Sequence, residues 1–256
     1  MAPFLAVKIL MWYYLSRMEA LNMGTIIRVE NLTKNYQLGE VTVEALKEAS
    51  FEIEEGEFVV ILGPSGSGKS TLLNIIGGMD TATSGRAFLR DQEITDMNEG
   101  QLTLYRRNKV GFVLQFYNLM SHLTAAENIE LSTEISENPL PVEQVLEDVG
   151  LSDRKDHFPS QLSGGEQQRV SIARAIAKNP ELILCDEPTG ALDYTTGITV
   201  LSLLAKLNKE MKKTVLVITH NSAIADMAHR VIHLGSGRIV ENRINEKVIR
   251  PEEVRW

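Results

Sequence analysis

The residues best suited to chemistry lie in the stretch GPSGSGKST, which runs from Gly63 to Thr71. Its glycines, lysine and hydroxyl fit the phosphate-loop spacing G-x-x-x-x-G-K-[ST]. Glycine lets backbone N–H groups approach phosphate oxygens without a Cβ atom in between. Lys69 adds a positive charge for the terminal phosphates, and the Ser70 hydroxyl can ligate Mg²⁺. The predicted triphosphate-binding residues are Gly63, Pro64, Ser65, Gly66, Ser67, Gly68, Lys69, Ser70 and Thr71.

Such a loop binds phosphate only if a buried strand leads into it and a helix begins at its far end. Residues 58–62, FVVIL, are apolar and rich in β-branched side chains, which predicts a central strand. Residues 70–76, STLLNII, predict a helix whose free N–H groups and positive dipole end attract an anion. A glycine turn that matches the spacing by chance is the alternative, and the flanking strand and helix disfavour it.

Two further predicted strands end in side chains that could assist phosphate cleavage. Residues 181–186, ELILCD, end in Asp186, which can hold Mg²⁺ through water in a phosphate-loop enzyme. Glu187 follows directly and could orient or deprotonate the attacking water. Residues 214–219, TVLVIT, lead to His220 at the strand edge where ligands of parallel sheets bind. A solvated Asp-Glu pair is the alternative interpretation of the two carboxylates.

The stretch LSGGEQQR, residues 162–169, contains a second helix start. Ser163 and Glu166 have the capping-box spacing S-x-x-E, and the apolar-periodic run VSIARAIA follows. Gly164 and Gly165 lie beside the N–H groups of this helix end, so it could be a second phosphate-binding terminus. On the residues alone, an ordinary capped helix is the more frequent interpretation.

The composition limits the class of protein. The 256 residues are 43% hydrophobic and 23% charged, as in an ordinary globular protein. The net charge of −8 argues against a dedicated nucleic-acid surface, which is normally basic, and no nucleic-acid partner is expected. The single cysteine, Cys185, excludes an intrachain disulfide, and we interpret it as a small buried side chain.

No apolar run reaches the roughly 18 residues of a membrane-spanning helix. The nearest candidate, FLAVKILMWYYL at residues 4–15, is too short and is interrupted by Lys8. Three interpretations of residues 1–22 stay open. They are an extension upstream of a real start at Met23, an amphipathic helix at a membrane surface, and a secretory signal with a poor cleavage site.

The order of the predicted elements indicates an α/β fold. Strands in residues 25–36 and 41–53 predict an N-terminal antiparallel β layer, and the later strand–helix–strand alternation predicts a phosphate-loop NTPase core with a mostly parallel sheet. Candidate helices at residues 125–135 and 142–149 predict an inserted α-helical subdomain. The predicted boundaries are residues 1–22 for the extension, 23–245 for the domain, about 116–165 for the helical subdomain and 246–256 for a mixed-charge tail.

Together these motifs resemble the nucleotide-binding subunits of ABC transporters over roughly residues 25–245. The run LSGGEQQR, placed between a phosphate loop and a strand ending in Asp-Glu, is highly specific for that family. The resemblance implies ATP and Mg²⁺ as ligands, with hydrolysis as the reaction. Ser70, Gln115 and Asp186 would hold the metal, while Lys69, Glu187 and His220 would serve catalysis.

The resemblance also gives roles to residues outside the central motifs. Tyr36 is similar in position to an aromatic that stacks on adenine, although a half-buried packing tyrosine is the better interpretation from composition alone. Gln115 would also couple the site to a partner, and Asp193 would lie in a loop that contacts a second subunit. Residues Ser163, Gly164, Gly165 and Glu166 would cap the ATP held by that second subunit.

The partners implied by the resemblance are a second copy of the chain and a separate integral-membrane permease. The protein would then be peripheral on the cytoplasmic face of the cell membrane. The run EPTGALD resembles the lipoprotein-releasing, macrolide-export and cell-division group, which implies export or mechanical work outside the membrane. The alternatives are a regulatory ATPase of a membrane complex and an ABC-type ATPase that acts on nucleic acid.

Overall fold

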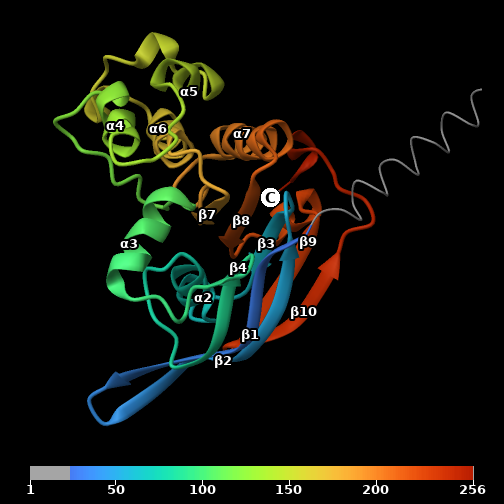
Figure 1. The fold of residues 1–256 in the computed structure, drawn as a ribbon. Coiled ribbons are helices and arrows are strands. Elements are labelled where there is room, and N and C mark those ends of the chain that lie inside the picture. Colours follow the sequence, from blue (N-terminus) through green and yellow to red (C-terminus); the bar gives the residue numbers. More distant parts are fainter. Residues whose placement is uncertain (1–23, 256) are drawn as a thin grey trace, which may run out of the picture.

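The computed structural model describes residues 24–255, so the predicted N-terminal extension lies outside the described residues. The described chain has an antiparallel β layer, a larger parallel sheet and a group of helices on the side away from the β layer (Figure 1). This arrangement confirms the predicted α/β class with its antiparallel layer. None of the helices in residues 24–255 is long and apolar enough to cross a membrane.

The antiparallel layer has four strands in the order β2-β1-β4-β5. Alternation of apolar and polar residues along the two long strands places one face against the core and leaves the other in solvent. The strand bounds are Thr25–Leu38 for β1, Val41–Glu54 for β2, Ser84–Leu89 for β4 and Gln92–Glu93 for β5.

The larger sheet has six strands in the order β10-β9-β3-β8-β7-β6. All neighbouring strands are parallel except the last hairpin, in which β10 runs antiparallel to β9. The bounds are Phe58–Leu62 for β3, Val110–Val113 for β6, Leu182–Asp186 for β7, Thr214–Thr219 for β8, Arg230–Gly235 for β9 and Arg238–Ile244 for β10. The mostly parallel sheet is as predicted.

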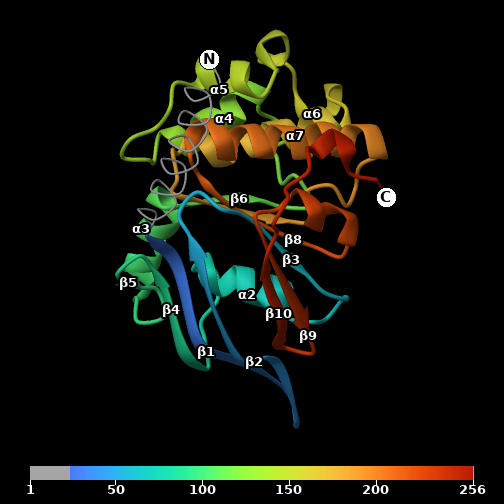
Figure 2. The same cartoon turned by 90° about the vertical axis from the view of Figure 1, so that its right-hand side faces the viewer.

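Alternate residues of β3 face two different cores. Val59 and Ile61 pack with α2 and the antiparallel layer, whereas Val60 and Leu62 pack with α6 and α7. Helix α2 therefore lies between the two sheets, and α7 covers the other face of the parallel sheet (Figure 2). Because both faces are covered, β3 and β8 are apolar throughout their length, as buried parallel strands require.

The helices begin and end close to the predicted positions, with one addition. The helices expected at residues 125–135 and 142–149 are α4 and α5. The addition is α3, which has no apolar periodicity that predicts it. It begins at the capping box of Asn98 and Gln101. The bounds are Lys69–Ile76 for α2, Glu99–Asn108 for α3, Ala125–Thr133 for α4, Val142–Asp148 for α5, Gly164–Ala177 for α6 and Tyr194–Met211 for α7. Short 3₁₀ turns cover Ser152–Arg154, Pro159–Gln161, Ser222–Met227 and Pro251–Glu253.

The C-terminal tail packs against α7. The Tyr194 hydroxyl donates to the Val254 carbonyl over 2.8 Å, and the Ser202 hydroxyl donates to the Glu252 carboxylate over 2.8 Å. Val254 itself is buried in the core beneath α7. The tail thus carries one core residue that its mixed-charge sequence does not indicate.

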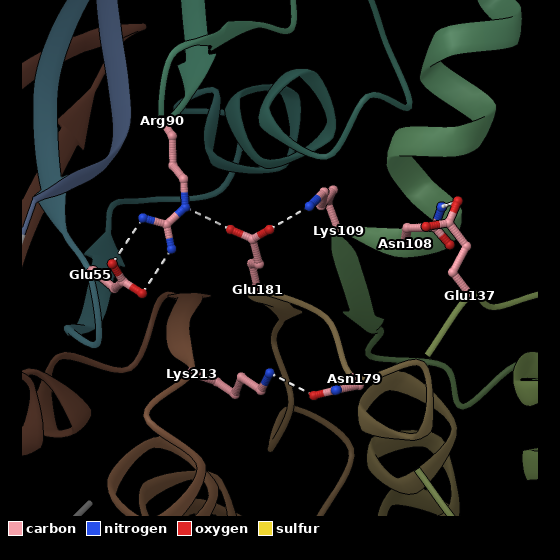
Figure 3. A network of polar contacts seen from close by, with 8 residues as sticks. All are labelled: Glu55, Arg90, Asn108, Lys109, Glu137, Asn179, Glu181 and Lys213. Carbon is pink, nitrogen blue, oxygen red and sulfur yellow. Dashed lines mark hydrogen bonds and ion pairs between the residues drawn. The ribbon is translucent and has the colours of Figure 1, made fainter. Parts of the chain in front are cut away.

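A network of polar contacts closes the amino edge of the parallel sheet (Figure 3). Glu181, which precedes β7, accepts from Arg90 Nε over 2.8 Å and from Lys109 Nζ over 2.6 Å. The Arg90 guanidinium also donates to both carboxylate oxygens of Glu55, over 2.9 and 2.8 Å. The network therefore joins the antiparallel layer to the parallel core.

Candidate nucleotide site

The phosphate loop connects β3 to α2, as its sequence predicts. Gly66 and Gly68 have φ angles of 76° and 101°, which are left-handed conformations that favour glycine. A Cβ atom at Gly63 would clash with the Leu234 carbonyl, and one at Gly68 would clash with the Ala45 carbonyl. Glycine is therefore required at both ends of the loop by the close approach of the surrounding backbone.

The interior of the loop is polar and incompletely satisfied. The Lys69 side chain is only 8% exposed, and its Nζ donates to the carbonyls of Gly63 and Pro64 over 2.7 and 2.9 Å. The Ser67 hydroxyl is buried and has no hydrogen-bond partner among residues 24–255. A buried unpaired hydroxyl beside a lysine and the N-terminus of α2 fits an oxygen-rich anion such as the phosphates of ATP.

A cavity of about 650 Å³ opens at the carboxyl edge of the parallel sheet, which is large enough for a nucleotide. It brings together most of the predicted site residues, namely Ser65, Gly66, Gly68, Lys69, Ser70, Thr71, Gln115, Asp186, Glu187 and His220. Gly63, Pro64 and Ser67 belong to the loop without lining the cavity. The phosphate loop and the ends of three neighbouring strands therefore form one site.

Asp186 ends β7 beside the N-terminus of α2. Burial raises the pKa of the Asp186 carboxyl, and the neighbouring charge of Glu187 acts in the same direction. A hydrogen bond from the Ser70 hydroxyl and the charge of Lys69 oppose this rise. With Gln115 on the cavity wall, these residues carry the kind of oxygen atoms that Mg²⁺ prefers.

Glu187 has an unusual backbone and a fully engaged carboxylate. Its φ angle of 46° is left-handed, which is strained for a residue with a Cβ atom. Its Oε2 accepts from the Thr219 hydroxyl over 2.9 Å. Its Oε1 accepts from the His220 backbone N–H over 2.9 Å and lies 2.8 Å from His220 Nδ1. The end of β8 therefore fixes the orientation of Glu187.

Tyr36 lies outside the residues that line the cavity. Its hydroxyl donates to Asp80 Oδ2 over 2.6 Å, and the Lys34 ammonium is 4.9 Å from its ring centroid. Burial, together with the Asp80 hydrogen bond, raises the pKa of Tyr36. Val43, its partner across the β1–β2 ladder, does line the cavity. Tyr36 therefore neighbours the cavity wall through Val43.

The LSGGEQQR stretch begins α6 with the predicted capping box. Ser163 Oγ accepts from the Glu166 N–H over 3.3 Å, and Glu166 Oε2 accepts from the Ser163 N–H over 2.8 Å. The hydrogen bonds from Ser163 lower the pKa of Glu166, and Arg154 contributes to the shift. None of the residues from Ser163 to Glu166 lines the cavity beside the phosphate loop.

Asp193 lies beside the start of α6 and away from the cavity. It is the N-cap of α7, where its carboxylate accepts from the Thr196 N–H over 3.1 Å and from the Thr196 hydroxyl over 2.6 Å. A Cβ atom at Gly165 would clash with the Thr196 side chain, so the starts of α6 and α7 pack closely. The structure thus separates the predicted residues into a cavity and a second group, in which Ser163 and Asp193 are exposed.

Sequence reasoning missed four residues of the site. Val43, Glu44 and Ala45 line the cavity from β2, and their strand pattern gives no sign of a ligand site. Thr219 donates to Glu187, and its place between a buried strand and His220 is the only sequence signal for it. Threonine is common in strands, so its presence there does not by itself indicate a functional role.

Comparison with known proteins places this geometry in a family. The family model "ABC transporter" matches residues 46–190. An uncharacterized ABC transporter ATP-binding protein of Thermotoga maritima is 48% identical over 85% of this chain and 94% of its own length. The macrolide export ATP-binding/permease protein MacB of Mannheimia succiniciproducens is 46% identical over 85% of this chain, which spans only 34% of MacB.

Solved structures agree with these sequence matches. The ATP-binding cassette MJ0796 of Methanocaldococcus jannaschii, in a dimeric post-hydrolysis state bound to ADP and phosphate, is similar with a TM-score of 0.78 and 44% identity. That match covers 85% of this chain and 98% of the cassette. CbiO1 of Clostridium perfringens has a TM-score of 0.76 at 28% identity, over 90% of each chain. The chain therefore belongs to the ABC transporter family, as an ATP-binding subunit that hydrolyses ATP.

Proposed function

We propose that the chain binds Mg-ATP in the 650 Å³ cavity and completes its catalytic site by closing head to tail on a second copy. The carrying observation is the separation of two groups of site residues. The phosphate loop, Asp186 and Glu187 share the cavity, whereas Ser163 and Asp193 lie outside it. A second copy in the opposite orientation would bring its own Ser163 to Glu166 over the open side of the cavity.

The start of α6 has the chemistry to act on a bound nucleotide. A helix N-terminus carries a positive dipole end and N–H groups without intrahelical partners. Ser163 is exposed, and the two glycines after it leave the helix end free of bulky side chains. The dimer of MJ0796 with ADP and phosphate supports this proposal, because it pairs two cassettes that are similar to this chain.

Mg²⁺ would be held by Ser70, Gln115 and, through water, Asp186. The ion, when bound, neutralises charge on the β- and γ-phosphates. Lys69 and the loop N–H groups stabilise the charge that develops on the γ-phosphoryl group. Glu187 orients and deprotonates the attacking water, while His220 contacts the γ-phosphate. Tyr36 would stack on the adenine, as the resemblance implies.

We further propose that hydrolysis drives a separate integral-membrane permease, with the chain peripheral on the cytoplasmic face of the membrane. The MacB match supports this partner, since MacB is by name both an ATP-binding protein and a permease. The same name supports export as the outcome of the cycle, and mechanical work outside the membrane is the alternative outcome.

The substitution Glu187→Gln tests the proposed site. It keeps the size and shape of the side chain and one acceptor oxygen, but removes the base. We expect ATP binding to persist while the turnover number falls by about 10²–10⁴-fold, the usual contribution of general base catalysis. Because hydrolysis then no longer opens the dimer, size-exclusion chromatography with ATP should show an accumulated dimer.

A matched control is Glu181→Gln, at the opposite end of the same strand. This variant should hydrolyse ATP at the normal rate and remain monomeric under the same conditions. Near-normal turnover by Glu187→Gln would remove Glu187 from the base role. A monomer that hydrolyses ATP at a rate independent of protein concentration would overturn the proposed dimer.

A further inference from the structure

Thr219, the last residue of β8, carries a buried hydroxyl beside the reacting groups. Its side chain is 1% exposed, and its Oγ1 donates to Glu187 Oε2 over 2.9 Å. The same oxygen accepts from the Asn221 N–H over 3.1 Å. Since a hydroxyl has one proton to donate and the Asn221 N–H occupies its acceptor side, that proton points at Glu187.

The other donors to Glu187 both come from His220. His220 contacts Oε1 through its backbone N–H and its ring, but its side chain is 70% exposed. Thr219 is β-branched, which restricts its χ1 angle, and it pairs with Leu62 inside the parallel sheet. Thr219 thus holds the carboxylate from inside the sheet, whereas the His220 ring contacts it from the exposed side.

Glu187 needs a rigid support, because its own conformation is strained. Its left-handed φ angle persists only where surrounding contacts hold it, and its long side chain has several rotatable bonds. A backbone hydrogen bond from the Glu187 N–H to the Ile218 carbonyl, over 3.0 Å, fixes the main chain against β8. Thr219 extends this attachment to the carboxylate itself.

We propose that Thr219 is a positioning residue for ATP hydrolysis, whose hydroxyl keeps the Glu187 carboxylate aimed at the attacking water when His220 turns to the γ-phosphate. The inference rests on the roles proposed above for Glu187 and His220. It adds a specific task for a residue that would otherwise be an ordinary strand threonine.

The test is Thr219→Val, which keeps the shape of the side chain and removes its hydroxyl. We expect the turnover number for ATP to fall between about 10-fold and 100-fold, because a misplaced catalytic group loses most of its effect. The KM for ATP should stay within about twofold, since Thr219 contacts Glu187 and does not itself line the cavity. Thr219→Ser, which restores the hydroxyl, should recover most of the turnover.

Thr214→Val is the matched control at the other end of β8. Thr214 is also 1% exposed, and its hydroxyl accepts from the Gly56 N–H over 2.9 Å. Both variants therefore lose a buried hydroxyl that bonds to backbone, and both should melt at a lower temperature. An equal loss of turnover in the two variants would show that Thr219 matters for stability alone and would overturn the proposal.

A double variant that carries both Thr219→Val and Glu187→Gln tests whether Thr219 acts through Glu187. If Thr219 acts through Glu187, adding Thr219→Val to Glu187→Gln should reduce the residual turnover no further. Thr219→Val alone should also accumulate an ATP-dependent dimer, as Glu187→Gln does, which is a readout independent of the hydrolysis assay. A multiplicative loss in the double variant would overturn the proposal.

Two outcomes distinguish this inference from the proposed function. Normal turnover by Glu187→Gln would overturn the proposed base, whereas a slow Glu187→Gln with a normal Thr219→Val would overturn only the role of Thr219. If the valine variant does not fold, Thr219→Cys replaces it, because a thiol is a weak donor. The cysteine variant should then be slower than Thr219→Ser, and equal rates would contradict the proposal.

Discussion

The two edges of the parallel sheet use the same strands for opposite purposes. At the carboxyl edge, the residues that follow β3, β7 and β8 line an open cavity with a strained Glu187 and a nearby unpaired Ser67 hydroxyl. At the amino edge, charged residues that precede β3, β6 and β7 bond to one another through Glu181 and Arg90 (Figure 3). One edge surrounds an open cavity that a ligand can enter, and the other pairs most of its charges within the chain.

The difference has a physical reason. Buried polar groups stabilise a fold only when their hydrogen bonds are made inside the protein, and unmade bonds favour whatever molecule can complete them. The amino edge makes most of those bonds within the chain, with the buried Asn108 Oδ1 as an exception among residues 24–255, so its contribution is to folding. The carboxyl edge surrounds a cavity that phosphate and metal can enter, so substitutions there should change activity and substitutions at the other edge should change stability.

The largest effect should come from Lys69→Ala at the carboxyl edge. Loss of a buried ammonium from the phosphate loop should lower the affinity for ATP by at least about 100-fold. Isothermal titration calorimetry measures this directly. Lys109→Ala removes the same type of side chain from the amino edge and should bind ATP normally. Unchanged affinity in the Lys69 variant would contradict the phosphate-loop assignment. Weak ATP binding by the Lys109 variant would show that the amino edge also serves ligand binding.

The next effect should come from Glu57→Ala at the amino edge. Glu57 and Arg230 form a bidentate pair at 2.9 and 3.0 Å with side chains only 11% and 12% exposed. Removal of one buried partner should destabilise the fold by about 3 kcal/mol and lower the melting temperature by about 6–12 °C. Hydrolysis per folded molecule should not change.

The exposed pair of Glu210 and Lys206 on α7 offers the control, because Glu210→Ala there should alter stability by less than about 0.5 kcal/mol. Equal melting temperatures for Glu57→Ala and Glu210→Ala would show that the buried Glu57–Arg230 pair stabilises the fold no more than an exposed pair does. A slower turnover number in the folded Glu57 variant would show that the amino edge also serves catalysis.

The smallest effect concerns Glu181 and should depend on pH. Burial alone would raise the pKa of Glu181, but the hydrogen bonds and charges of Lys109 and Arg90 outweigh it and lower the pKa below the ordinary 4.5. A carboxylate with a lowered pKa stabilises the fold above its ordinary pKa, and this contribution disappears as the pH falls through the lowered value. Glu181→Gln should therefore lose about 1 kcal/mol at neutral pH, because the pairs are partly exposed.

Thermal unfolding of the wild-type protein and Glu181→Gln over a pH series checks this. The difference between the two melting temperatures should be largest near pH 7 and shrink below pH 4.5. A difference that stays constant over the series would mean that the charge of Glu181 is not the stabilising feature.

The parts of the fold that sequence reasoning predicted share a local origin. The strand, loop and helix around the phosphate loop follow from apolar patterning and glycine spacing within about 20 residues, and the Ser163 capping box spans only four. Helix α3 was not predicted, because most of its residues are polar and its buried residues are Leu102 and Tyr105. The packing of the tail against α7 was not predicted, because Val254 is the one fully buried residue among residues 246–255 and stands among charged neighbours.

By itself, the sequence determined the phosphate loop, the strand ends at Asp186 and His220 and the start of α6, because each depends on contacts between residues close in the chain. Only the tertiary structure decided that β2 walls the cavity, that Thr219 holds Glu187 and that the Ser163 group lies apart from it. It alone also joined Arg90 to Glu181, 91 residues away. Such contacts arise when separate elements pack together, and no local pattern of side chains encodes which distant partner each polar group will meet.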